Sequence, residues 1–241
     1  MTIPSETWLK FVKRLEKIDQ AAAKAMLEYI SKNGGIAAIP ERQLIDYAYG
    51  IATKYGEASA ALSAEMYDAI AAASGASVPA AVAANTVPYK RIEADLSDVL
   101  TFSVNDNLAA FTTAKHVKKA GQDTMLQNAV RDGAEWAWVP NGDSCQFCLM
   151  LASNGWQKGQ KNGGADHIHA NCNCSYVVRF NGRSGVKGYD PDKYKAIYDN
   201  AEGDNWREKL NFMRREQYAE NADEINAKKR AAYAMRKEEQ E

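Results

Sequence analysis

Hydrophobic residues recur every three or four positions over the first thirty residues of the chain. This spacing places them on one face of a long amphipathic helix. The residues are Trp8, Phe11, Val12, Leu15, Ile18, Ala22, Ala25, Met26, Tyr29 and Ile30. The sequence KNGG at 32–35 predicts the end of this helix, because glycine readily adopts the left-handed conformation of a helix C-terminus.

A second helical pattern begins at Pro40, a residue that suits the first turn of a helix because its missing N–H would have no partner there. Its apolar positions are Leu44, Ile45, Ala48, Ile51, Ala52 and Tyr55, continued beyond Gly56 by Leu62, Met66 and Ile70. We expect the two helices to form an antiparallel hairpin, in which their many alanines allow a close approach.

The segment 74–89, SGASVPAAVAANTVPY, contains two prolines and few charges, which predicts a loop or a boundary. Helical periodicity returns at about 91–100 and again from about 108 to 132. GAEWAWVPNGDS and CSYVVRF (174–180) alternate between the two sides of an extended chain, so each predicts a short strand. The charge-alternating tail over 205–241 predicts a further helix.

These patterns predict a mainly α fold. We expect a long N-terminal helical hairpin region over 1–90, a small α+β module stapled by zinc over 91–200, and a charged helical tail over 201–241. The chain has 241 residues and a formal net charge of −1, so it has no global field to attract nucleic acid or an anionic membrane. It contains no apolar run long enough to span a membrane and no signal-peptide pattern. We therefore expect it to fold in a reducing cytosol.

All four cysteines and two of the three histidines lie within residues 145–174. A C-x-x-C pair lets two thiolates meet one ion, and an H-x-x-C-x-C follows it after twenty intervening residues. Cysteine and histidine sets of this kind suit tetrahedral zinc. The five ligand candidates are Cys145, Cys148, His169, Cys172 and Cys174, and His167 would be a sixth.

Structural zinc takes four ligands, so we predict Cys145, Cys148 and His169 with one or both of Cys172 and Cys174. A saturated site leaves no position for water, and the ion would then be structural. Two alternatives stay open, namely a pair of disulfides or a redox-active thiol, and no metal at all. A reducing cytosol weighs against the disulfides.

The residues around the cysteines and elsewhere have ordinary structural explanations. We expect Asp143 or Ser144 to cap a short helix that ends at Gly155. We expect Ser153 to lie in the turn that supports the zinc site.

Among the remaining candidates, we expect His116 to be an exposed helix histidine and not a catalytic base. Trp136 and Trp138 are expected to pack in the sheet or in an interface. No Ser-His-Asp grouping is visible in the sequence.

The sequence VPNGDSCQFCLMLASNGW, followed by HANCNC, YVVRF and GYDPDKY, resembles the phage Mu F-like head morphogenesis family. It is most similar to the branch in phages of actinobacteria that is commonly labelled capsid maturation protease. The N-terminal helix and KYGEASAALSAEMYDA extend the resemblance, which covers about residues 5–200. Residue by residue, the resemblance implies a role only for the candidate metal ligands Cys145, Cys148, His169, Cys172 and Cys174.

This resemblance implies a minor capsid protein inside the head of the virion, made in the bacterial host cytoplasm during assembly. Its implied partners are the portal protein, the major capsid protein or both. Packaged DNA is a further candidate partner, and we expect no membrane partner.

Two classes of function follow from this reading: a zinc-stapled structural protein of the head, or a protease that trims scaffold or capsid protein. The sequence favours the structural class. A serine protease needs a base beside its nucleophile, and two of the three histidines here belong to the metal cluster. A zinc peptidase needs an open coordination position and a nearby base, and the sequence contains no H-E-x-x-H. A free-standing DNA-binding zinc domain is least favoured, because few basic residues flank the cluster.

Overall fold

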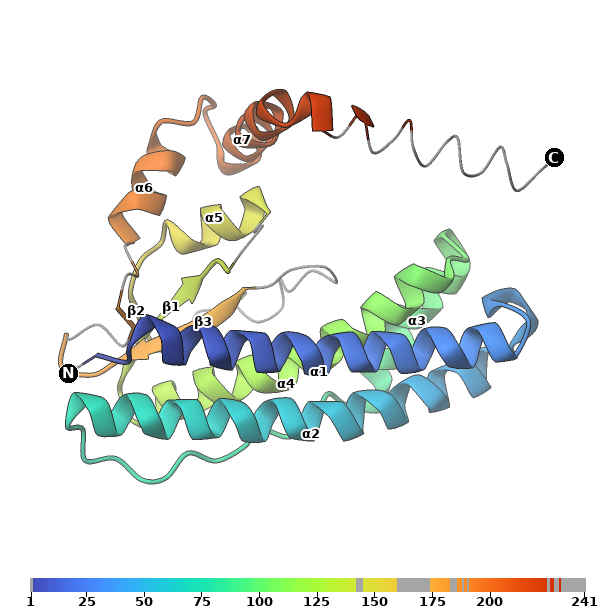
Figure 1. Cartoon of the computed structure of the whole chain (residues 1–241), viewed down its shortest axis with the longest axis horizontal. Helices are drawn as coiled ribbons and strands as arrows, with labels where there is room; N and C mark the ends of the chain where they lie inside the picture. Colours follow the sequence, from blue (N-terminus) through green and yellow to red (C-terminus); the bar gives the residue numbers. More distant parts are fainter. Residues whose placement is uncertain are drawn as a thin grey trace.

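The computed structural model describes residues 2–141, 145–159, 174–182, 186–187, 189, 191–224, 226–227 and 230. Three long helices, α1 (Ser5–Lys32), α2 (Glu41–Ser74) and α4 (Asp106–Arg131), lie side by side in an elongated bundle (Figure 1). The short 3-10 helix η1 (Ile36–Ala38) joins α1 to α2, and α3 (Tyr89–Phe102) packs on α2 and α4. The predicted mainly α class is confirmed.

Glycines follow the ends of α1 and α2, and the sequence predicted this for α1. Gly34 and Gly35 follow α1 with φ values of 84° and 96°, and Gly75 caps α2 with a φ of 67°. Pro40 is the N-cap residue of α2 and not a residue of its first turn, and the helix continues without a break through Gly56. The two long helices thus form the predicted hairpin, with α4 packed against both.

The segment between α2 and α3 has no helix or strand, as predicted. Side chains of the bundle provide acceptors for its main-chain N–H groups. Asp68 accepts a hydrogen bond from the N–H of Ala81 (2.8 Å), and Asn128 accepts one from the N–H of Val82 (2.9 Å). The polar residues of α2 and α4 therefore hold this extended segment along the helices.

A three-stranded antiparallel sheet lies at one end of the bundle, in the order β2-β1-β3. Its strands are β1 (Glu135–Val139), β2 (Gln157–Lys158) and β3 (Ser175–Arg179). The predictions of β1 and β3 are confirmed, whereas the two-residue β2 was not predicted. Residues 136–139 are all buried despite their alternating pattern, because α5 contacts β1 while α4 contacts both β1 and β3.

Three further helices follow the central strand: α5 (Gln146–Ala152), α6 (Pro191–Asp199) and α7 (Trp206–Glu220). Figure 1 shows α6 and α7 next to α5, on the far side of the sheet from α1, and both helices contact α5. The helix α7 lies in the predicted helical tail, whereas α6 was not predicted. Residues 231–241 of that tail lie outside the described residues.

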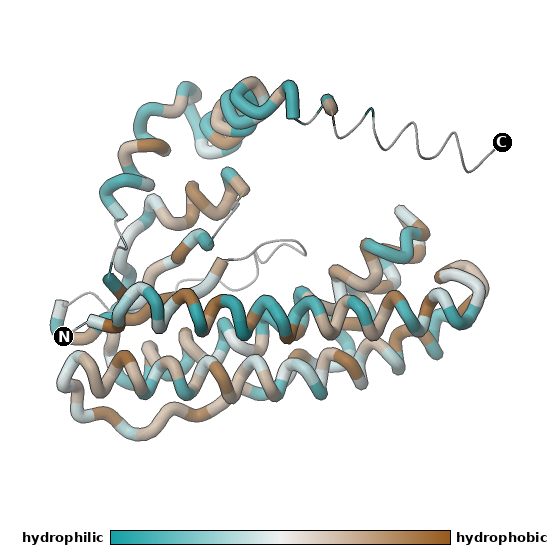
Figure 2. The backbone as a smooth tube through the Cα atoms, viewed as in Figure 1, coloured by the Kyte–Doolittle hydropathy of each residue, from teal (hydrophilic) through white to brown (hydrophobic). Residues whose placement is uncertain are grey.

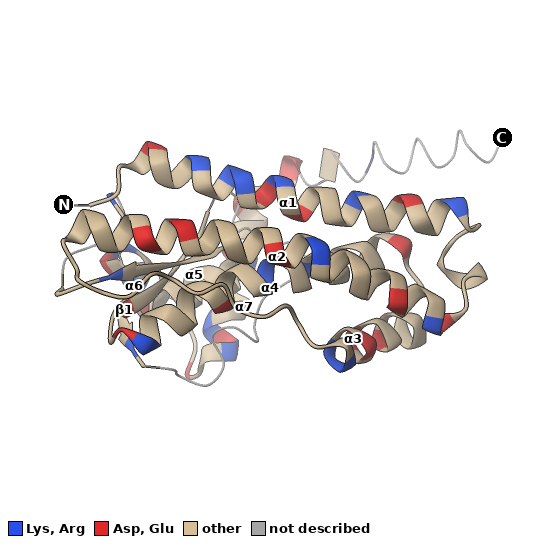
Figure 3. Ribbon diagram, turned by 90° about the horizontal axis from the view of Figure 1, so that it is seen from below, with Lys and Arg blue, Asp and Glu red and all other residues tan. Residues whose placement is uncertain are grey.

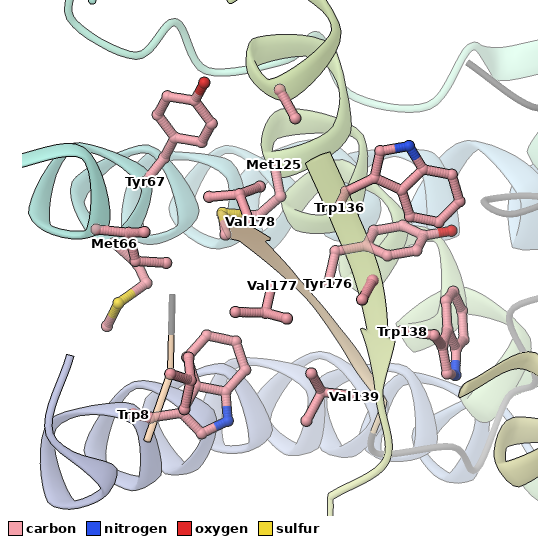
Figure 4. Packing of buried hydrophobic residues seen from close by; sticks show 14 of the residues in the cluster. Trp8, Met66, Tyr67, Met125, Trp136, Trp138, Val139, Tyr176, Val177 and Val178 are labelled. Carbon is pink, nitrogen blue, oxygen red and sulfur yellow. The ribbon is translucent and has the colours of Figure 1, made fainter. Parts of the chain in front are cut away.

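The buried hydrophobic residues form two clusters. The cluster at the sheet end combines residues of α1, α2, α4, β1 and β3, including Trp8, Tyr67, Met125, Trp138 and Tyr176 (Figure 4). The other cluster fills the space between the long helices, η1 and α3. Figure 2 shows hydrophobic and hydrophilic residues interspersed along α1, as expected for an amphipathic helix.

The predicted domain divisions at residues 90 and 200 stay predictions, although α4 contacts α1 and α2 along the bundle. Figure 3 shows acidic and basic residues interspersed along α1 and α2. No helix within the described ranges combines the length and the apolar character needed to cross a bilayer.

Candidate metal centre

The short helix α5 brings together the two cysteines of the C-x-x-C. Cys145 is its N-cap residue, in an extended conformation, and its carbonyl oxygen accepts a hydrogen bond from the N–H of Cys148 (2.9 Å). This turn places the two sulfur atoms 3.5 Å apart. Asp143 and Ser144, which were predicted to cap this helix, lie outside the described residues.

The separation of these sulfur atoms fits one edge of a tetrahedral zinc site. Two thiolates bound to one zinc ion at about 2.3 Å lie about 3.8 Å apart. Cys148 is fully buried and Cys145 partly buried, so the pair is largely shielded from water. At the other end of α5, the Ser153 hydroxyl donates to the Met150 carbonyl oxygen (2.7 Å) and Gly155 has a φ of 62°. These residues form the predicted turn.

Cys174 lies directly before β3 and is also buried. Its carbonyl oxygen accepts a hydrogen bond from the Gln122 side-chain amide on α4 (2.8 Å). Among the residues that the structure describes, no three His, Cys, Asp or Glu side chains gather in a group suited to a metal ion. His167, His169 and Cys172 lie outside the described residues. The structure therefore brings together Cys145 and Cys148, and the complete ligand set stays a prediction.

Asn141 ties both ends of the cysteine segment to the bundle. Its Oδ1 accepts a hydrogen bond from the Trp8 indole on α1 (3.3 Å), and its Nδ2 donates to the Ser175 hydroxyl on β3 (3.2 Å). The chain before Cys145 and the chain after Cys174 are thereby held against each other. No local pattern in the sequence distinguishes Asn141, because its partners Trp8 and Ser175 are distant in sequence.

Aromatic side chains pack against one another in the sheet beside the cysteines. Tyr176 packs edge-on against Trp136 and Trp138, with ring centroids 5.1 and 4.7 Å apart. The Trp136 indole also donates to the carbonyl oxygen of Gly159 (2.8 Å), just after β2. Both tryptophans are buried, which confirms that they serve in packing.

Arg179, at the end of β3, connects this strand to the neighbouring strand β1. It donates a hydrogen bond to Glu135 on β1 (2.7 Å), and this bond lowers the pKa of the Glu135 carboxyl. Its guanidinium also lies over the Trp156 ring, 4.5 Å from the centroid. Arg179 thus connects the segment after α5 to β3 and, through Glu135, to the central strand β1.

The prediction that His116 is exposed was wrong. Its side chain is buried, and its Nε2 lies 3.3 Å from Oδ2 of Asp95 on α3. Burial lowers the pKa of His116, so the ring stays neutral at pH 7. The sequence could not show this burial, because it arises where α3 covers α4. The helix α3, which carries Asp95, lies at the end of the bundle away from the sheet (Figure 1).

Comparison of the chain with known proteins and families identifies one family. No curated protein and no solved structure matches the chain significantly. A family model described as VG15 protein matches residues 2–201, which include the long helices, the sheet and the whole cysteine segment. Because this match spans most of its length, the chain belongs to the VG15 protein family, a phage-associated family.

Proposed function

We propose that this phage protein is a minor capsid or head morphogenesis protein that lies inside the head, associated with the portal or the capsid shell. Membership of a phage-associated family supports the general assignment. The resemblance of residues 5–200 to the Mu F-like head morphogenesis proteins supports the more specific role. An elongated helical bundle with one shared core at its sheet end suits a protein that acts by docking.

We further propose that a structural zinc ion stabilises the sheet end. The observation that carries this proposal is the 3.5 Å separation of the Cys145 and Cys148 sulfur atoms. These two residues would hold one edge of the site, and His169 with one or both of Cys172 and Cys174 would complete it. The bound ion would supply a cross-link. The chain between the ligands, ASNGWQKGQKNGGADHI, is too polar and glycine-rich to pack by itself.

The burial of His116 supports the structural class over the protease class. It is the one histidine outside the cysteine segment, and its ring nitrogens are enclosed by α3 and α4. A general base must reach the proton that it removes from a nucleophile. A side chain so enclosed beside Asp95 does not meet that requirement for a protein substrate.

Elemental analysis of the purified chain tests the zinc site. We expect about one zinc per chain, and loss of the metal in Cys145→Ser and Cys148→Ser. The control Ser153→Ala alters the same short helix without removing a ligand candidate, so it should keep the metal. The zinc proposal would be refuted if the protein contained no metal and mass spectrometry found its cysteines paired in disulfides.

Electron microscopy of assembled heads tests the location, and co-expression with the capsid protein tests the alternative. We expect the chain inside the head, in contact with portal or shell, and no defined cut in the capsid protein. A defined cut that disappears with Cys145→Ser, while that variant stays folded and incorporated, would instead establish the capsid maturation protease.

A further inference from the structure

A small cavity of about 20 Å³ lies where α1, α2 and α4 meet the start of β3. Polar side chains from all three helices line it, although the surrounding core is apolar. They are Asp19 from α1, Ser59 and Ser63 from α2, and Lys118 and Gln122 from α4.

Three buried polar atoms of these residues have no hydrogen-bond partner within the described protein, namely Asp19 Oδ1, Ser63 Oγ and Gln122 Oε1. They come from three different helices and line the same cavity. A buried polar atom without a partner is costly, so such atoms are nearly always satisfied by protein or by bound water. Their convergence on one cavity therefore points to a ligand that forms hydrogen bonds with all three.

The chemistry of the three atoms defines what the ligand must offer. The Gln122 amide nitrogen donates to the Cys174 carbonyl oxygen, so Oε1 is left as an acceptor. Asp19 also presents an acceptor oxygen, and the Ser63 hydroxyl can donate or accept. The ligand must thus donate at least two hydrogen bonds and be able to accept one.

The size and charge of the cavity select among such ligands. A volume of about 20 Å³ admits a single guest of the size of water. A metal cation is disfavoured, because the Lys118 ammonium lies 3.5 Å from Oδ2 of Asp19 and already provides a positive charge. We propose that one internal water molecule binds here and bridges Asp19, Ser63 and Gln122.

This water site would connect the helical bundle to the cysteine segment. Gln122 bonds on one side to the main chain of Cys174 and would bond on the other to the water. The water would therefore fix the orientation of the Gln122 amide, and Gln122 acts as a positioning residue for the start of β3. The site itself requires no metal, so it can be tested independently of the proposed zinc.

A crystal structure of the full chain, grown in sodium and again after replacement of sodium by thallium, tests the proposal. We expect one oxygen peak within hydrogen-bond distance of Asp19 Oδ1, Ser63 Oγ and Gln122 Oε1, without anomalous signal in thallium. A dry cavity would overturn the proposal. An anomalous thallium peak would also overturn it, in favour of a monovalent cation.

The variant Ser63→Ala provides a second test, because it removes one partner of the water and leaves the bond from Gln122 to Cys174 in place. We expect weaker water density and a melting temperature lower by about 2–4 °C, as for the loss of one buried hydrogen bond in a chain of this size. Ser31→Ala, at an exposed position of α1, is the control and should leave both unchanged. Unchanged water density and melting temperature in Ser63→Ala would contradict the bridging role.

Discussion

Gly121 lies on the face of α4 that packs against Ser59 and Ser63 of α2. A Cβ atom at this position would lie 2.5 Å from the Ser59 hydroxyl oxygen and 2.8 Å from that of Ser63. It would also lie 3.2 Å from the carbonyl oxygen of Ser59, which belongs to the helix backbone. One methyl group would therefore require the two serine side chains or the helix backbones to shift.

We expect Gly121→Ala to lower the free energy of unfolding by about 1–3 kcal/mol, the usual cost of overpacking. Gly50→Ala is the matched control on α2, because a Cβ there meets no atom within 4 Å. It should raise the stability by about 0.5–1 kcal/mol, since alanine loses less conformational entropy than glycine in a helix. Urea denaturation measures the free energy of unfolding of both variants. Equal changes at Gly121 and Gly50 would contradict close packing at Gly121.

Asp19 makes the stability of the chain depend on pH near neutrality. Burial raises the pKa of its carboxyl from 3.8 to about 7, and Lys118 offsets only part of this effect. Because the folded state holds the proton more tightly than the unfolded state, stability should fall as the pH rises from 3.8 through about 7.

The variant Asp19→Asn cannot titrate, so it should gain stability relative to the wild type over this pH range and keep a constant advantage above it. The gain is on the order of a few kcal/mol at most. Urea denaturation at a series of pH values measures the difference. Asp98→Asn, at an exposed position of α3, is the control, and a flat difference for Asp19→Asn would rule out the raised pKa.

His116 should have the opposite pH dependence. Burial lowers its pKa below the ordinary value of 6.5, so protonation favours the unfolded state. The stability due to neutral His116 is present above pH 6.5 and is lost as the pH falls below it. We expect His116→Gln, which keeps a polar group near Asp95, to remove this loss of stability as the pH falls below 6.5. The same acid sensitivity in the variant and the wild type would show that His116 does not cause it.

At the scale of elements, α1 contacts the rest of the protein through one face. Leu15 packs against the cluster at the sheet end, whereas Leu9 on the same helix is 54% exposed. We expect Leu15→Asp to lower the free energy of unfolding by more than about 2 kcal/mol, because it places a charge against apolar side chains. Leu9→Asp introduces the same charge on the solvent side and should cost less than about 0.5 kcal/mol. Circular dichroism during urea denaturation measures both, and equal losses would contradict this orientation of α1.

At the scale of the whole molecule, the sheet and the long helices share one hydrophobic cluster (Figure 4). We therefore expect them to unfold together, so that the thermal midpoints from far-ultraviolet circular dichroism and tryptophan fluorescence coincide. Trp206→Phe removes the signal of the exposed tryptophan on α7. The remaining fluorescence reports on the sheet end through Trp8, Trp136, Trp138 and Trp156.

If zinc stabilises the sheet end, a chelator should lower both midpoints together. Loss of the fluorescence signal well before loss of helicity would show that the sheet and its cysteines unfold as an independent unit. The proposed structural role of the ion would then be confined to that unit.

The sequence by itself determined the features that depend on neighbouring residues along the chain. Apolar spacing predicted α1, α2 and α4, and glycine predicted where α1 ends. The C-x-x-C spacing brought the Cys145 and Cys148 sulfur atoms together, because a single turn at the start of a helix sets that distance. A periodic pattern or a turn can be read locally, since each is fixed by interactions over a few residues.

Only the tertiary structure decided which polar residues are buried and what they contact. His116 is enclosed because α3 packs on α4, and Gln122 bonds to Cys174 although 52 residues separate them. Neither position has a local pattern that distinguishes it from an exposed polar residue of a helix. Burial is a property of the partner surface, so the polar cavity and the anchoring of Cys174 appear only when the helices and the sheet are packed together.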